Sequence, residues 1–223
     1  MKHSNHAERG NVLFILLIAV VLIAGLTYAI TSSNRGGENL SAEKTLIAAD
    51  AMSSFGVDIK RGIEMLTRQG KSESTISFAS PSLSNYGTAD TTPDAEVFNI
   101  RGGGVAFVDV PSGINDGSPW EFYGFTRAPG VGDDTQADLM LVLPNVNQNF
   151  CKAYNRKAGY ADNAAIPTDS AACLHDTSKR FSGTFADTGT ANTMDTGTFR
   201  TPAGFACVAC GTSYHAYYVI IDR

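Results

Sequence analysis

The sequence predicts an α+β protein: an N-terminal apolar helix, then an amphipathic helix packed on an antiparallel β-sheet head. Three patterns support this fold class. An uncharged apolar run comes first, a helically spaced apolar stripe covers residues 41–69, and short aromatic and β-branched segments follow between Gly and Pro turns. The 223 residues leave enough chain after the apolar run for one ordinary globular domain.

The apolar run extends from Val12 to Ile30, and its 19 residues read VLFILLIAVVLIAGLTYAI. At a rise of about 1.5 Å per residue, a helix of this length spans the hydrocarbon core of a bilayer. Residues 1–11 carry a charge of +1, from Lys2, Glu8 and Arg9. Because the net charge of the whole chain is −5, residues 12–223 carry −6. Because Lys and Arg favour the cytoplasmic side, we expect a single-pass inner-membrane protein with its head in the periplasm or outside the cell.

Three interpretations of the N-terminus are open. A cleaved secretory signal would use Thr27-Tyr28-Ala29 as its cleavage site, although the apolar run is long for such a signal. A plain signal anchor fits the length and the charge without further assumptions. The third interpretation depends on the residues just before the run.

Glu8-Arg9-Gly10-Asn11 followed by the apolar run resembles the class III leader of type IV pilins and type II secretion pseudopilins. The resemblance implies that residues 1–10 are a cytoplasmic leader and that a prepilin peptidase cuts after Gly10. Asn11 would then be the first residue of the mature chain, and residues 11–33 would be the hydrophobic helix, in the membrane first and in a filament core after assembly.

Two positions depart from the family pattern. Ile15 occupies the place where the family usually carries a Glu, whose carboxylate meets the amine of a neighbouring subunit. Asn11 stands where the family usually has Phe or Met. The missing carboxylate shifts the expectation from a major repeating subunit toward a minor one.

The segment after the run predicts a neck and then a head. The Gly36-Gly37 pair lies in the polar stretch 34–40 and is expected to break or loosen the helix there. The head is then residues 41–223. Its first element is a helix from Ser41 to Gln69, in which Gly56 and Gly62 lower the helix propensity. The apolar stripe of this helix consists of Leu46, Ile47, Ala51, Met52, Phe55, Ile59, Ile63 and Leu66.

Short strands are predicted for the rest of the head, with turn residues between them. The predicted strands are Val97–Ile100, Val105–Val110, Glu121–Phe125, Leu139–Leu143 and Tyr214–Ile221, with Phe181–Phe185 as a further candidate. A short helix is predicted at 145–157, and Trp120 is expected to fill a core or a subunit contact. A chain that ends in a strand after a helix and a meander resembles a pilin head.

The cysteines predict disulfides. Cys151, Cys173, Cys207 and Cys210 are even in number and lie in the outward domain, where disulfides are permitted. Three pairings are open. We favour those in which Cys207 and Cys210 each pair with Cys151 or Cys173, because closing such long loops stabilises by about 3–4 kcal/mol each. A C-x-x-C redox site is disfavoured because a strand follows the motif, and a four-cysteine zinc site because Cys151 and Cys173 are 22 residues apart.

The composition and motifs predict a structural protein. The chain has no basic face for nucleic acid, and its outward domain offers only His175 and His215 as imidazole bases, without a G-x-S-x-G or H-E-x-x-H motif. We expect no enzyme activity, no cofactor and no metal. The expected function is a subunit of a pilus-like or pseudopilus-like filament, which associates with itself or with other pilin-like subunits. The alternative is a permanently anchored extracytoplasmic binding module.

Overall fold

The computed structural model describes residues 9–132, 136–169, 173–187, 189–194 and 196–223, with the side chains of 9–13, 29–40 and Thr196 left aside. The chain forms two compact units, Met1–Lys44 and Thr45–Arg223. Helix α1 (Arg9–Arg68) is 60 residues long and contributes to both. The helix break expected at Gly36-Gly37 is not present. A Gly inside a helix costs about 1 kcal/mol relative to Ala, which does not end a helix that has long flanks on both sides.

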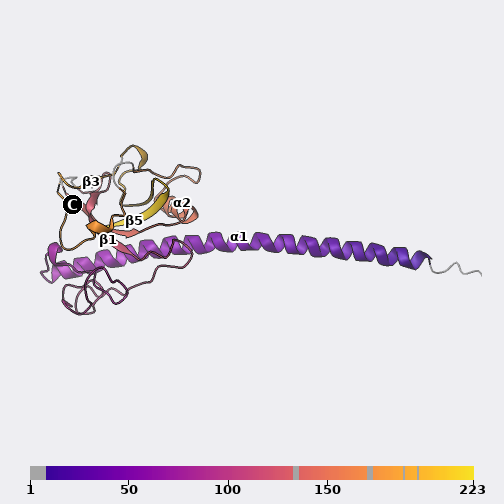
Figure 1. Ribbon diagram of the computed structural model, residues 1–223, viewed down its shortest axis with the longest axis horizontal. Helices are drawn as coiled ribbons and strands as arrows, with labels where there is room; N and C mark the ends of the chain where they lie inside the picture. Colours follow the sequence, from indigo (N-terminus) through magenta and orange to yellow (C-terminus); the bar gives the residue numbers. More distant parts are fainter. Residues whose placement is uncertain (1–8, 133–135, 170–172, 188, 195) are drawn as a thin grey trace, which may run out of the picture. The chain divides into compact units, whose positions relative to one another are not determined.

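The second unit is built on a five-stranded mixed sheet, which confirms the α+β class (Figure 1). The strand order is β3-β1-β2-β5-β4, with β3 parallel to β1 and all other neighbours antiparallel. The strands are β1 (Glu121–Arg127), β2 (Asp138–Leu143), β3 (Asn192–Thr193), β4 (Phe205–Cys210) and β5 (Ser213–Ile221). The remaining helical elements are α2 (Gln148–Lys157) and the short 3-10 helices η1 (Glu73–Thr75), η2 (Thr177–Lys179) and η3 (Thr196–Thr198).

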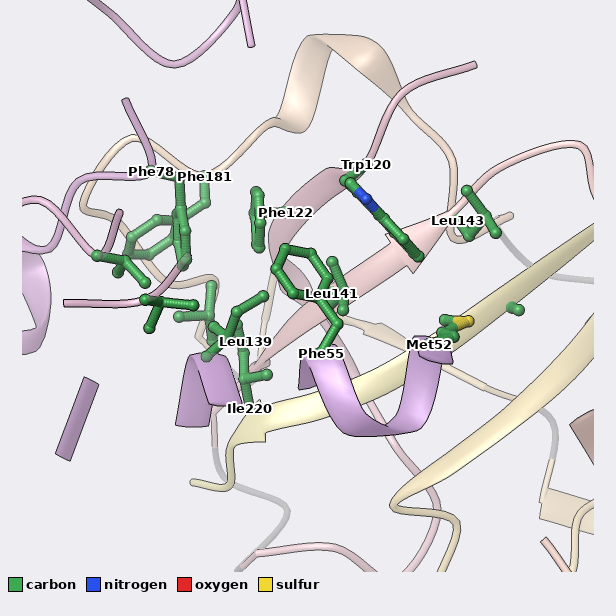
Figure 2. Packing of buried hydrophobic residues seen from close by; sticks show 14 of the residues in the cluster. Met52, Phe55, Phe78, Trp120, Phe122, Leu139, Leu141, Leu143, Phe181 and Ile220 are labelled. Atoms are coloured by element: carbon green, nitrogen blue, oxygen red, sulfur yellow. The ribbon is translucent and has the colours of Figure 1, made fainter. Parts of the chain in front are cut away.

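One face of the sheet is covered by the C-terminal part of α1. Figure 2 shows Met52 and Phe55 of this helix beside Leu139 and Leu141 of β2, in one buried apolar cluster. The ring of Trp120 lies 5.2 Å from that of Phe55, centroid to centroid, and its indole N–H donates to the carbonyl of Val108 at 2.7 Å. Trp120 therefore fills a core, as the sequence predicts. Of the predicted stripe, Met52, Phe55, Ile59, Ile63 and Leu66 are buried here. Leu46 and Ile47 are exposed instead, and Ala48 and Ala49 take their place in the core.

The opposite face of the sheet is covered by irregular chain. Strand residues that point away from α1 form a second apolar cluster with side chains of the segment 174–203. Its members include Tyr123, Phe125, Met140, Val142, Val208, Tyr217 and Val219 from the sheet, and Leu174, Met194, Phe199 and Ala203 from the covering segment. Strand β2 is therefore buried along its whole length, which agrees with its near-continuous apolar sequence.

Three of the predicted strands are confirmed, since β1, β2 and β5 contain Glu121–Phe125, Leu139–Leu143 and Tyr214–Ile221. The strands predicted at Val97–Ile100 and Val105–Val110 are wrong, because the first segment is folded into turns and the second is extended chain outside any strand. The carboxylate of Glu96 is buried and accepts the backbone N–H groups of Asp90 and Thr92, each at 3.0 Å. These bonds hold residues 90–96 in a compact turn, directly before the segment whose side chains have strand character.

The other differences concern β4 and two short segments. Strand β4 was not predicted, and Phe181–Phe185 is not a named strand, although the N–H of Phe181 donates to the carbonyl of Phe122 at 2.8 Å. The short helix predicted at 145–157 is present as α2. It starts later because Asn147 is its N-cap and accepts the N–H of Phe150 at 2.9 Å.

The two glycines inside the helical stripe mark places where α1 approaches other chain closely. A Cβ atom added to Gly56 would lie 2.6 Å from the ring of Tyr218 on β5. A Cβ atom added to Gly62 would meet Val105 and the backbone of Gly103. The glycines that lower the helix propensity therefore allow α1 to lie close to its neighbours.

We predict that Gly56→Ala destabilises the head by about 1–3 kcal/mol, because the new methyl group overlaps the Tyr218 ring. The gain of about 1 kcal/mol in helix propensity offsets only part of this loss. Chemical denaturation of the full chain in detergent measures the difference. Ser54→Ala, at an exposed position of the same helix, is the control and leaves stability nearly unchanged. Combination with Tyr218→Ala reduces the cost of Gly56→Ala; a Gly56→Ala protein as stable as the original would contradict the prediction.

Candidate functional site

The apolar part of α1 is the first candidate, as an assembly or anchoring surface. Over residues 14–28, its large apolar side chains are between 44% and 77% exposed, on all sides of the helix. They are Phe14, Ile15, Leu16, Leu17, Ile18, Val20, Val21, Leu22, Ile23, Leu26 and Tyr28. Where the structure describes side chains, no helix has both the length and the apolar character needed to cross a membrane.

The residues expected at a leader cleavage site lie at the start of the same helix. The backbone of Gly10 and Asn11 is in the first turns of α1. Residues 1–8 of the expected leader lie outside the described residues. Cleavage after Gly10 stays a prediction.

The second candidate region is the β4–β5 hairpin, where both disulfides end. Cys207 pairs with Cys151 and Cys210 pairs with Cys173, with Cα–Cα distances of 5.2 and 5.5 Å. The favoured type of pairing is thus confirmed, and none of the four cysteines is free. The two bridges differ in their surroundings. Cys151 and Cys207 are completely buried, whereas Cys173 and Cys210 are half-buried.

The outer edge of β4 is closed by groups that come from outside the sheet. The N–H of Cys207 donates to Oδ1 of Asn155 at 2.6 Å, and Nδ2 of Asn155 donates to the carbonyl of Cys207 at 2.9 Å. Two residues further on, the N–H of Ala209 donates to Pro167 at 2.8 Å, and the N–H of Asp169 donates to Ala209 at 3.1 Å. An exposed strand edge invites pairing with another chain, and these bonds occupy it at both residues.

Two histidines meet beside the half-buried Cys173–Cys210 disulfide. The rings of His175 and His215 lie 5.5 Å apart, centroid to centroid, and Nδ1 of His215 accepts the N–H of Asn145 at 3.2 Å. Burial lowers the pKa of His215 to about 4; the charge of a protonated His175 also lowers it, while Asp116 opposes the shift. One sulfur each of Cys173 and Cys210 and one nitrogen of His215 all lie within 4.8 Å of one another. The sequence places these residues in three separate segments and gives no sign that they meet.

A buried ion pair attaches the covering segment to β1. Arg180 donates to both carboxylate oxygens of Glu121, with both distances 2.7 Å, and the hydroxyl of Tyr86 donates to the same carboxylate at 2.6 Å. Burial and the hydrogen bond to Glu121 raise the pKa of Tyr86. Because all three groups are occupied by one another, they are suited to holding the fold and unsuited to acid–base catalysis.

No protein-family model matches the chain, and comparisons with curated proteins and with solved structures found no match. The interpretation of function therefore depends on the residues and on their arrangement.

The first prediction for this region concerns the edge of β4. Asn155→Leu is expected to destabilise the head by about 2–5 kcal/mol, because it leaves a buried N–H and a buried carbonyl of Cys207 without partners. Thermal or chemical unfolding in detergent measures the loss. Asn149→Leu, at an exposed position of the same helix α2, is the matched control and should change stability by less than about 0.5 kcal/mol. Equal losses of stability in Asn155→Leu and Asn149→Leu would show that the hydrogen bonds between the Asn155 side chain and Cys207 do not stabilise the head.

The second prediction concerns pH. Between about pH 6.5 and pH 4, the unfolded chain binds a proton at His215 that the folded chain does not bind. The contribution of His215 to stability is thus complete above pH 6.5 and falls as the pH decreases, by up to about 3 kcal/mol. Unfolding free energies of the oxidised protein with a chelator, measured from about pH 7 to pH 4, should fall more steeply than those of His215→Gln. Parallel curves would contradict the low pKa.

Proposed function

We propose that the chain is a structural subunit of a pilus-like or pseudopilus-like filament. The apolar part of α1 would hold it in the inner membrane before assembly, with the head in the periplasm or outside the cell. The observation that carries this proposal is the helical segment 14–28, whose apolar side chains are exposed all around the helix.

The amount of exposed apolar surface on residues 14–28 supports the proposal that this part of α1 is covered by lipid or by another helix. Burying one large apolar side chain is worth about 1.5–3 kcal/mol, so the eleven side chains of the segment represent on the order of 20 kcal/mol. This exceeds the net stability of most domains, which is about 5–15 kcal/mol. A helix that is apolar on every side is normally covered by lipid or by other helices.

The leader residues and the head agree with the same proposal. Glu8-Arg9-Gly10-Asn11 stands before the apolar run as in prepilins. In the head, the C-terminal part of α1 packs on the sheet, and the final strand β5 lies between β2 and β4. The packing of a helix on a sheet is what the resemblance to pilins implies, whereas the resemblance places the last strand where it closes the sheet.

Ile15 gives the proposal a more specific form. It stands where the family carries the Glu that pairs with a neighbouring amine, and its side chain is exposed on α1. Contacts through this helix would therefore be apolar, without that ion pair. A minor subunit that joins other pilin-like subunits fits such contacts better than a subunit that repeats along the whole filament.

The test is the N-terminus of the protein purified from its native membrane or filament fraction. Intact mass and N-terminal sequencing should show a chain that begins at Asn11. Gly10→Leu should leave the precursor uncut, because the peptidase requires a small residue before the cut, whereas Gly25→Leu in the middle of the apolar run should leave processing unchanged.

Three outcomes separate the candidate functions. A start at Asn11 supports the filament pathway. A start at Met1 or Lys2 overturns prepilin processing and favours the permanently anchored binding module. A start near Ile30 indicates a cleaved secretory signal and overturns both.

A further inference from the structure

The half-buried Cys173–Cys210 disulfide and the histidines beside it form a set of possible metal-binding side chains. Cys210 is the last residue of β4, and His215 is the third residue of β5. The register pairs Cys210 with Ser213 and Val208 with His215, so Cys210 and His215 are diagonal neighbours on one face of the sheet. Cys173 is bonded to Cys210 from the covering segment. The buried side chain of Leu174 fixes the position of this segment.

The ligand atoms of this set lie close enough together for a zinc site to form after reduction. Tetrahedral zinc has bonds of about 2.0–2.3 Å to nitrogen and sulfur, so its ligand atoms lie about 3.5–3.8 Å apart. One ligand atom from each of Cys173, Cys210 and His215 lies within 4.8 Å of the other two. Small rotations of side chains would bring them to zinc geometry once the sulfur–sulfur bond is broken. His175 lies outside this group of three; its ring centroid is 5.5 Å from that of His215, and its half-buried ring would have to turn toward the sulfurs to supply the fourth ligand.

We propose that Cys173, Cys210, His215 and His175 form a redox-gated site for Zn²⁺ or another thiophilic cation. In the oxidised chain the two sulfurs are bonded to each other; in the reduced chain they bind the metal. This proposal does not depend on the filament function, since it concerns only the head.

The chemistry balances with a dithiol as the reductant. The dithiol gives two electrons and two protons to the Cys173–Cys210 bond and becomes a disulfide itself, while the protein gains two thiols. When Zn²⁺ binds, each thiol releases its proton to solvent and the two thiolates bind the ion. Reoxidation by a disulfide of the same class releases the metal and restores the bridge.

The hydrogen bond of His215 does not prevent metal binding. Nδ1 accepts the N–H of Asn145 in the oxidised protein, and this bond has to be given up if Nδ1 binds the metal or carries the ring proton. Such a bond is worth about a tenth of the free energy that zinc gains in a structural site. Asn145 is half-buried, so its N–H can turn to water.

The other disulfide lacks these features. Cys151 and Cys207 are completely buried in the apolar cluster under α1. Among the described residues, neither belongs to a group of three possible metal ligands. The half-buried Cys173–Cys210 bridge is also the more accessible of the two to a dithiol.

The test uses the full-length chain in detergent, with His3→Ala and His6→Ala in every sample so that N-terminal imidazoles do not bind the probe. The chain is treated with a dithiol, freed of it without oxygen and titrated with Zn²⁺ against a chromophoric chelator. We expect one zinc ion per reduced chain and an affinity at least 100-fold lower for the oxidised chain. With Co²⁺ as the probe, the reduced chain should show the intense near-ultraviolet absorption of cobalt–thiolate bonds.

Three variants identify the ligands. Cys173→Ala/Cys210→Ala should abolish the cobalt–thiolate absorption while the buried Cys151–Cys207 bridge is kept. His215→Ala and His175→Ala keep both disulfides when oxidised, which allows circular dichroism to verify their folding before reduction. Each should weaken zinc binding at least tenfold, the lower end of the range for loss of a metal-site partner.

The proposal would be overturned by zinc binding of equal strength in the oxidised and reduced chains. It would also be overturned by cobalt–thiolate absorption that persists in Cys173→Ala/Cys210→Ala, since the thiolates would then come from Cys151 and Cys207. If both histidine variants fold and bind zinc as tightly as the original, the metal is held by the thiolates alone and the proposed site is wrong.

Discussion

The sheet of the head has to be covered on both faces, and the rest of the structure follows from this constraint. Strand β2 is buried along its whole length, so neither face can be left to solvent. The C-terminal part of α1 and helix α2 supply apolar side chains for one face. The other face is covered by the chain segment between α2 and β4, which has little regular structure.

A covering segment of this kind needs attachments other than a hydrogen-bonded helix or strand, because fixing each residue costs conformational entropy. The attachments are the bidentate pair between Arg180 and Glu121, the Cys173–Cys210 bridge, and the bonds of Pro167 and Asp169 to β4. The bonds of Pro167 and Asp169, together with those of Asn155, also occupy the outer edge of β4. These bonds leave no free backbone groups at Cys207 and Ala209 for another strand to pair with.

The sequence allowed the fold class to be predicted because its strongest patterns are local. The apolar stripe of α1 and the strands at Leu139–Leu143 and Tyr214–Ile221 each depend on side chains that are close in sequence. The pairing of late with early cysteines followed from loop closure. Strand β4 was missed because its sequence, FACVAC, is rich in Ala and Cys and has little strand character.

What the sequence could not show are contacts between distant residues. The need for Gly56 comes from the Tyr218 ring, 162 positions later, and the meeting of His175 with His215 comes from the path of the covering segment. Glu96 is a different case, since its partners lie within a few residues. The side-chain pattern of Val97–Ile100 suggested a strand. The carboxylate of Glu96 stabilises a turn directly before this segment, at residues 90–96.

The order of the two disulfides along the chain has one more consequence. Each bridge joins a cysteine that precedes Leu174 to a cysteine of β4, since Cys151 pairs with Cys207 and Cys173 with Cys210. A protease that cuts the backbone at any point between Cys173 and Cys207 would leave two fragments joined by two covalent links. The part of the head with the least regular structure can therefore be nicked without release of the C-terminal hairpin.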